Sequence, residues 1–250
     1  MLTKARIQLI RSLATSKGRR SEGLFVAEGP KLVSELLPRL SRVYMAATEE
    51  WSGEEPDDRI SDAELSRASL QQHPQQVIAL FKIPTYDVSL ETACRNGLCL
   101  GLDDVQDPGN LGTIVRVADW FGVTDIFCSQ HTADIWNPKA VQATMGAVSR
   151  VRVHYNIINI AEAIAALPAD IPVYATALDG ESVWETELAG GGLVIMGNEG
   201  NGISDAVMRV CRKRLLIPNY PQGRATSESL NVAMATGIIL NEFRRRTVNR

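Results

Sequence analysis

The chain from residue 97 onwards alternates apolar segments of strand length with segments that have the apolar spacing of helices. The expected strands are residues 98–102, 125–129, 173–178, 193–197 and 214–218. The expected helices are residues 111–121, 138–147, 161–167, 205–211 and 230–246. Alternation of this kind predicts the α/β class, with a mostly parallel sheet that helices cover on both faces. In such sheets ligands bind at the carboxyl ends of the strands, so the loops there are candidate sites.

The first part of the chain is expected to form a smaller α/β unit. Its expected elements are a helix over 5–15, a strand over 24–27, a helix from Gly29-Pro30 through Leu37 and a strand over 77–81. Residues 17–20 (Lys-Gly-Arg-Arg) are interpreted as a turn with a cluster of cations, and residues 87–96 as a linker. We therefore expect two domains, residues 1–95 and residues 96–250.

Composition excludes several classes of protein. The 250 residues are 45% hydrophobic and 22% charged, which is typical of a globular chain and unlike a disordered one. No apolar run reaches the roughly 18 residues of a membrane-spanning helix, and the N-terminus lacks the apolar stretch of a signal peptide. The four cysteines form no CxxC pair and have no metal-ligand spacing with the three histidines. We therefore expect free thiols, no metal, no membrane contact and a cytoplasmic location.

The formal net charge of -3 argues at first against a nucleic-acid partner, but the charge is unevenly distributed. Residues 1–45 carry +6 and residues 205–250 carry +6, whereas residues 46–70 carry -6 and residues 71–204 carry -9. Two basic ends around an acidic middle suit a polyanionic partner better than the total implies. Solvated helix faces are an equally good interpretation of the charge pattern alone.

Three loops that follow expected strands have unusual composition. The first is Asp107-Pro108-Gly109-Asn110-Leu111-Gly112, which leads into a helix that carries Arg116. Asn110 is expected to cap this helix. The neighbours of Arg116 in sequence are apolar, and a cation in apolar surroundings needs a partner. The alternative is a surface arginine that pairs with Asp119 at i+3.

The second loop is Gly197-Asn198-Glu199-Gly200-Asn201-Gly202, directly after an apolar strand. Three glycines in six residues leave room for a ligand or for another backbone segment. The order of the glycines fits neither of the common phosphate-binding loops, and Glu199 would repel a phosphate. A carboxylate there can accept hydrogen bonds or attract a cation. A tight turn capped by Ser204 would explain the glycines but not Glu199.

The third loop begins at Ile217-Pro218 and ends in the segment Thr226-Ser227-Glu228-Ser229-Leu230-Asn231-Val232-Ala233, before a long apolar helix. Serine and asparagine at that place are ordinary N-cap residues. Capping explains any one of these loops, but it does not explain three such loops at the strand ends of one sheet.

The three loops together carry a resemblance. The order Asn110-x-Gly112-x-x-x-Arg116, then Met196-Gly197-Asn198-Glu199-Gly200-x-Gly202-Ile203-Ser204, then Ile217-Pro218 with 228–233 resembles the SpoU/TrmH family. Members of this family are S-adenosylmethionine-dependent RNA ribose 2′-O-methyltransferases of the SPOUT class. The resemblance covers about residues 97–243. Residues 17–35, with Phe25-Val26-Ala27-Glu28-Gly29, resemble the substrate-binding domain of the ribosomal-RNA members.

The resemblance implies a small N-terminal α/β RNA-binding domain and a C-terminal methyltransferase domain with a deep trefoil knot. It places S-adenosylmethionine at Thr176, Gly197, Ile217 and Leu230. It assigns catalysis to Asn110, Arg116, Glu199, Ser229 and Asn231. It also implies a homodimer through the C-terminal domain, with the active site near the interface. The segment from Pro218 to Ser229 is longer than the common spacing of the family, which leaves the placement of Ile217 open.

The free-energy cost of deprotonation decides which residue is expected to accept the proton. Family mechanisms cast the arginine of the first motif as general base, but deprotonating an arginine at pH 7 costs about 7–9 kcal/mol. We therefore expect Arg116 to stay cationic, to orient a phosphate and to stabilise the developing alkoxide. Glu199 or the RNA phosphate would take the proton. Asn110, Ser229 and Asn231 would align the two reactants.

Ribosomal RNA is the expected substrate, with transfer RNA as an alternative. The basic N-terminal residues are expected to bind the phosphate backbone, with salt-dependent affinity. The target ribose is expected in a loop or bulge, and the 2′-hydroxyl itself excludes DNA. A non-catalytic RNA-binding or ribosome-assembly protein is a second alternative. A nucleotide-dependent oxidoreductase is disfavoured, because the chain lacks the glycine fingerprint and the ribose-binding acid of that class.

Overall fold

The computed structural model describes residues 1–155, 157, 159–221, 224–225 and 227–248 and contains two compact units. The first unit is Met1–Thr85 with Asp134–Arg150, and the second is Tyr86–Ala133 with Val151–Arg250. The division expected after residue 95 stays a prediction about domains, and the compact units differ from it in two places. Helix α5 (Leu90–Asn96) packs on strand β5 (Leu98–Asp103), so most of the expected linker is a helix of the second unit. Helix α7 (Pro138–Thr144) packs on strand β1 (Leu24–Glu28) and belongs to the first.

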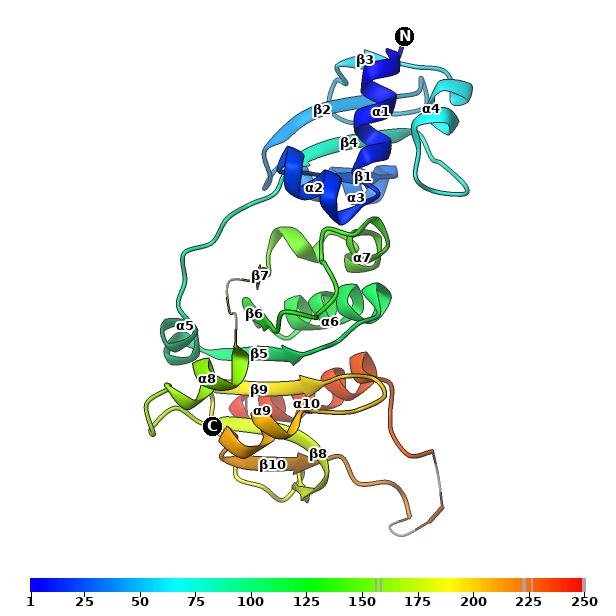
Figure 1. Ribbon diagram of the computed structural model, residues 1–250. Helices are drawn as coiled ribbons and strands as arrows, with labels where there is room; N and C mark the ends of the chain where they lie inside the picture. The colour runs from blue at the N-terminus through cyan, green and yellow to red at the C-terminus, as the bar shows by residue number, and fades with distance from the viewer. Residues whose placement is uncertain (156, 158, 222–223, 226, 249–250) are drawn as a thin grey trace. The chain divides into compact units, whose positions relative to one another are not determined.

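The second unit is built on a six-stranded sheet in the order β10-β8-β9-β5-β6-β7 (Figure 1). Every pairing in this order is parallel, which confirms the predicted α/β class. The strands besides β5 are β6 (Asp125–Cys128), β7 (Arg152–His154), β8 (Val173–Ser182), β9 (Gly192–Gly197) and β10 (Lys213–Leu216). Five of the six coincide with expected segments. Strand β7 was not expected, because two of its three residues are charged or polar.

Helices cover both faces of this sheet, as the alternation predicts. They are α6 (Pro108–Trp120), α8 (Ile160–Ala165), α9 (Asp205–Val210) and α10 (Val232–Val248), besides α5. Figure 1 shows α9 in front of the sheet and α10 behind it. Helices α5, α8 and α9 share one apolar core with β5, β8 and β9, whereas α6 and α10 pack against each other. Within the described part of the chain no helix is long and apolar enough to cross a membrane.

A glycine of β5 leaves space for a side chain of β9. A Cβ atom on Gly101 of β5 would lie 2.4 Å from Cδ1 of Ile195 of β9, so a larger residue there would displace that side chain. Leu102 pairs with Met196 and Asp103 with Gly197 at the carboxyl ends of the two strands. The loops that follow β5 and β9 therefore begin side by side.

The first unit has a four-stranded sheet in the order β1-β4-β2-β3. Strand β4 is antiparallel to β1 and β2, and β2 is parallel to β3. The elements besides β1 and α7 are α1 (Lys4–Ser12), α2 (Ser16–Glu22), α3 (Pro30–Leu36), β2 (Arg42–Ala47), β3 (Asp58–Arg59), α4 (Asp62–Ala68) and β4 (Val77–Lys82). The expected turn at residues 17–20 is wrong, since those residues lie in α2. The hydroxyl of Thr15 caps this helix by accepting from the Gly18 N–H at 3.1 Å.

One cation of that segment is internal. Arg19 is 2% exposed, and its guanidinium donates to Asp134 Oδ2 through Nε at 3.0 Å and through Nη2 at 2.6 Å. Its Nη1 donates to the carbonyl oxygens of Leu13 and Ala14. Phe25 also packs on Trp136, with ring centroids 4.6 Å apart. These contacts hold residues 134–150 in the first unit.

Candidate functional site

The three loops singled out in the sequence meet through side-chain amides at the carboxyl end of the parallel sheet. Asn110 Nδ2 donates to Glu199 Oε1 at 3.0 Å across 89 residues of sequence. Asn231 Nδ2 donates to Asn110 Oδ1 at 2.9 Å across 121 residues. One residue from each loop is therefore held in a single chain of hydrogen bonds.

Glu199 accepts hydrogen bonds on both carboxylate oxygens. The backbone N–H groups of Asp107 and Gln106 donate to Oε1 at 3.1 Å and to Oε2 at 3.2 Å. Burial alone would raise the pKa of Glu199, but the hydrogen bonds from Asn110 and from these N–H groups lower the pKa below its usual value. The carboxylate that a tight turn left unexplained therefore joins its own loop to the loop after β5.

The start of α6 explains why the Asn110 amide is available for these bonds. The helix begins at Pro108 with Asp107 as N-cap, and Asp107 Oδ1 accepts from the Asn110 N–H at 2.8 Å. Proline is favoured in the first turn because it has no N–H to leave without an acceptor. The expectation that Asn110 caps the helix is therefore wrong: Asn110 lies inside the first turn.

The loop 197–204 is held by Asn198. Its backbone pairs with Gly202 in both directions, at 2.9 and 3.0 Å. Its Oδ1 accepts from the N–H groups of Gly200 and Asn201, and its Nδ2 donates to the carbonyl oxygen of Asp104 at 2.8 Å. A Cβ atom on Gly197 would lie 2.3 Å from the carbonyl carbon of Gly202, so only glycine fits there.

Ser204 and Asn231 both stand where a residue would cap a helix, but only Asn231 does so through its side chain. Ser204 stands at the N-cap of α9, but its side chain makes no capping bond, and its N–H donates instead to Asp103 Oδ2 at 2.8 Å. Asn231 Oδ1 accepts from the N–H groups of Ala233 and Met234, so it does cap α10. The same amide bonds to Asn110, which means that Asn231 has a capping and a tertiary role together.

A cavity of about 470 Å³ lies beside this hydrogen-bond chain, which is within the usual range of small-molecule sites. All four residues expected to bind the methyl donor are part of its wall: Thr176, Gly197, Ile217 and Leu230. Glu199 and Ser229 are part of the wall too. The longer segment after Pro218 therefore does not remove Ile217 from the cavity.

The cavity wall is mixed in character. Apolar side chains come from β9, the loop after it, β10 and the start of α10, and they include Met196, Ile203 and Leu215. Asp179, which forms an ion pair with Arg214, and Glu228 add further carboxylates to that of Glu199. Thr176 donates from Oγ1 to the Ile195 carbonyl oxygen at 3.0 Å, which holds β8 against β9. No group of three histidine, cysteine or acidic residues within the described ranges could hold a metal ion.

Arg116 differs from its expected surroundings. Its neighbours Ile114, Val115 and Ala118 are buried, but Arg116 lies on the exposed side of α6. Arg116 is therefore the surface arginine of the alternative interpretation, but it forms no hydrogen bond or ion pair with another described residue, so the pairing with Asp119 is not observed. The structure brings Asn110, Glu199 and Asn231 into direct contact and leaves the Arg116 guanidinium in solvent. The catalytic and binding roles of these residues stay predictions.

Two residues of the site were missed from the sequence. Asn198 holds the loop that carries Glu199, and Asp103 binds the end of the same loop through Ser204. Asn198 lies among glycines, where a side chain that accepts backbone N–H groups is typical of a tight turn. Nothing in the sequence pairs Asp103 with Ser204, because 101 residues separate them.

Comparison with known proteins decides the family. Residues 97–241 match the SpoU rRNA Methylase family. The chain belongs to the SpoU rRNA methylase family. Residues 4–79 match the MRM3-like substrate binding domain. The family implies the deep trefoil knot, which the strand order alone does not demonstrate.

Relatives of this SpoU-family chain match nearly its whole length. A 23S rRNA (guanosine(2553)-2′-O)-methyltransferase of Bacillus subtilis, RlmP, is 31% identical over 94% of each chain. A TrmH-family protein of Porphyromonas gingivalis has a similar structure, with a TM-score of 0.88 and 38% identity over 98% of this chain and 99% of its own. An rRNA methyltransferase of Sinorhizobium meliloti, solved with AdoMet bound, has a TM-score of 0.82 and 28% identity over 98% and 96% of the two chains.

Proposed function

We propose that this chain transfers the methyl group of S-adenosylmethionine to the 2′-hydroxyl of a ribose in ribosomal RNA. The observation that carries the proposal is the position of Glu199, which belongs to the cavity wall and also to the hydrogen-bond chain of Asn110 and Asn231. A donor in the cavity would therefore lie against polar groups that can align a hydroxyl. Ribosomal RNA is favoured over transfer RNA because relatives that match almost the whole chain are named for it.

The cavity fits the chemistry of the methyl donor. Its apolar side chains suit an adenine ring, and the bare backbone at Gly197 allows close approach of a ligand. Its carboxylates, among them Glu199, favour a positive charge nearby. Thr176, Gly197, Ile217 and Leu230 would hold the donor. When bound, S-adenosylmethionine supplies a methyl group on a cationic sulfur.

Glu199 acts in this proposal as an anchor and not as the general base. Both of its oxygens already accept hydrogen bonds, and its pKa lies below the usual value, so it is a weak proton acceptor at neutral pH. Its bonds position the loop before α6 and the Asn110 amide. These hydrogen bonds reserve Glu199 for positioning, which leaves the RNA phosphate as the proposed proton acceptor.

Arg116 supplies the cation of the reaction. An exposed guanidinium that has no partner among the described residues can bind a phosphate through two parallel hydrogen bonds. It would orient the target nucleotide and stabilise the developing alkoxide. Replacement of Arg116 by alanine is expected to abolish most activity, and full activity of that variant would contradict this role.

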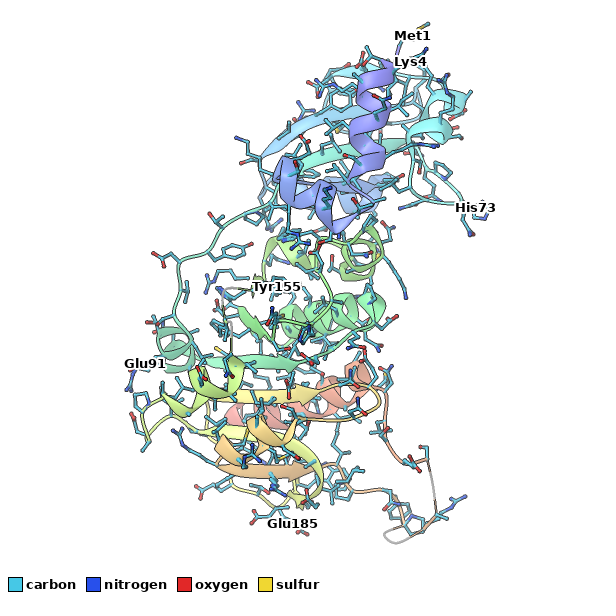
Figure 2. The ribbon with its side chains drawn as sticks, in the orientation of Figure 1. Met1, Lys4, His73, Glu91, Tyr155 and Glu185 are labelled. Carbon is cyan, nitrogen blue, oxygen red and sulfur yellow. The ribbon has the colours of Figure 1, made fainter. Side chains whose placement is uncertain are left out.

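The partners of the chain follow from its exposed surfaces. Lys4, which Figure 2 labels at the start of α1, is exposed together with Arg11, Lys17 and Arg20. We propose that these cations bind the RNA backbone. Trp120 of α6 is 85% exposed and Met234 of α10 is 65% exposed, and we propose that the packed pair α6 and α10 forms a homodimer interface. A cytoplasmic location stays a prediction.

A single experiment tests the reaction. The full chain is incubated with unmodified ribosomal RNA and S-adenosylmethionine that carries a labelled methyl group, and alkali-resistant positions are then mapped. We expect label at one ribose. A chain that binds the donor but transfers no label to any RNA would overturn the proposal and favour a non-catalytic RNA-binding protein.

A further inference from the structure

A second hollow, of about 320 Å³, lies at the carboxyl ends of β5 and β6, outside the cavity described above. Its wall is mixed in character, and its polar residues include Asp103, Asp104, Ser129 and His131. Ligands of parallel sheets bind at this end of the strands. The hollow has no role in the proposed function.

Two carboxylates in the wall of the hollow each have a hydrogen-bond donor on only one oxygen among the described residues. Asp103 is 5% exposed, and its Oδ2 accepts from the Ser204 N–H, while its Oδ1 has no hydrogen-bond donor among the described residues. Asp104 accepts from the Ser129 hydroxyl on Oδ1 alone. Neither carboxylate has a cation within 4.0 Å in the described ranges. The remaining oxygen of each carboxylate reaches solvent and can accept a hydrogen bond, so the wall favours a ligand that brings N–H donors.

The hollow is joined to the reaction centre by the loop 197–204. Residues 197–203 belong to the wall of the first cavity, and Ser204 belongs to the wall of the hollow. The carbonyl oxygen of Asp104 accepts from Asn198, the neighbour of Glu199. Two residues beyond Asp104, the Gln106 N–H donates to Glu199. A group in the hollow would therefore contact one end of the loop that carries Glu199.

We propose that this hollow binds the base of the target nucleotide and selects guanine through Asp103 and Asp104. This inference rests on the proposed function. Guanine presents two neighbouring donors, N1–H and the N2 amino group, which a carboxylate accepts together. Uracil places its one donor between two carbonyl oxygens, which carboxylates repel, and adenine and cytosine have one amino donor beside acceptors. The negative charge also disfavours a phosphate, and the described residues offer no three-residue metal site.

The test starts from the labelled ribosomal RNA above. Nuclease digestion and mass spectrometry identify the methylated nucleoside, which we expect to be 2′-O-methylguanosine. RNAs with inosine or adenosine at that position are then compared with the guanosine RNA. Inosine lacks the N2 amino group, so we expect kcat/KM to fall about tenfold for inosine and more than about 100-fold for adenosine.

Variants locate the selection at Asp103. Asp103→Asn keeps an oxygen for the Ser204 N–H but presents an amide donor to the base, so we expect guanosine and inosine RNAs to differ by less than about twofold. Donor binding, measured by calorimetry, is expected to be unchanged. Asp205→Asn removes the same charge at an exposed position outside the hollow and is expected to keep the wild-type preference. If Asp103→Asn does not fold, Asp104→Asn and the wild-type comparison with inosine still decide.

The remaining outcomes distinguish failure of the guanine site from failure of the methyltransferase proposal. Label in another nucleoside, or equal rates with inosine and guanosine in the wild type, would overturn the guanine site and leave the methyltransferase proposal standing. Label in no RNA would remove both. Stabilisation of the wild type by spermidine, absent in Asp103→Asn and without base selection, would assign the hollow to an amine and overturn the inference.

Discussion

Asn231, at the start of α10, donates from its side-chain amide to the amide oxygen of Asn110, in the first turn of α6, at 2.9 Å. This bond sets the direction of the Asn110 amide, because its Nδ2 must then face Glu199. A reversed Asn110 amide would place two donors against each other at Asn231 and two acceptors against each other at Glu199. The position of α10 therefore sets the direction of the Asn110 amide and, through it, the hydrogen bond to Glu199.

The first prediction replaces the amide donor of Asn231 with a charged acceptor. Asn231→Asp keeps an oxygen that can cap α10 but replaces Nδ2 with an oxygen that repels Asn110 Oδ1. We expect kcat to fall about tenfold or more, with a change in unfolding free energy below about 1 kcal/mol, because the cap remains. Steady-state kinetics and urea denaturation measure the two effects. Asn219→Asp makes the same change at an exposed position outside the cavity wall, and equal losses in both variants would contradict the prediction.

The second prediction compares two glycines of one loop. A Cβ atom at Gly197 would lie 2.3 Å from the backbone of Gly202, whereas a Cβ atom at Gly200 would come no closer than 3.6 Å to Asn198 Oδ1. Gly197→Ala is therefore expected to lower the unfolding free energy by about 1–3 kcal/mol and to abolish most donor binding. Gly200→Ala is expected to retain both. Calorimetric titration with S-adenosylmethionine checks the difference, and wild-type affinity in Gly197→Ala would show that the loop can open at no cost.

The sequence predicts the elements whose signal is local. The apolar runs of β5 and β9 and the glycines around Glu199 locate the sheet and the loop, and family motifs bring Asn110 and Asn231 to one place. Other features depend on partners far along the chain. In the sequence Arg19 is one of several cations in a basic segment. Its burial depends on the ion pair with Asp134, which lies 115 residues away. Strand β7 was missed because Arg152 and His154 replace apolar residues, and both are held by Asp125.

The third prediction separates the structural cation of α2 from the cations proposed to bind RNA. Arg19→Met leaves Asp134 and two carbonyl oxygens without their donor, so we expect a loss of about 3 kcal/mol in unfolding free energy. Arg20→Met is expected to change stability by less than about 0.5 kcal/mol, because Arg20 is exposed. Arg20→Met is instead expected to weaken RNA binding and to reduce the slope of log affinity against log salt by about 1. Filter binding at several salt concentrations and urea denaturation measure these effects, and the reverse assignment would contradict the structure.

The fourth prediction concerns the acid stability that Asp125 contributes. This side chain accepts from Arg152 at 2.7 and 2.6 Å, and it is 2.9 Å from His154 Nε2. Burial alone would raise the pKa of Asp125, but the hydrogen bonds from His154, Arg152 and Thr124 lower the pKa well below its usual value of 3.8. A carboxylate with a lowered folded pKa stabilises the protein above its unfolded pKa, and this contribution is lost as the pH falls toward the folded pKa.

Asp125→Asn is therefore expected to cost about 3 kcal/mol of unfolding free energy at pH 7. Between pH 7 and pH 3 the difference from the wild type is expected to shrink by about 1 kcal/mol, because pH 3 lies almost one unit below the usual pKa of an aspartate. Urea denaturation at both pH values gives the two differences. Asp170→Asn, at an exposed ion pair with Arg95, is expected to change the unfolding free energy by less than about 0.5 kcal/mol at pH 7. A constant difference between Asp125→Asn and the wild type across this range would mean that the loss comes from packing and not from the charge of Asp125.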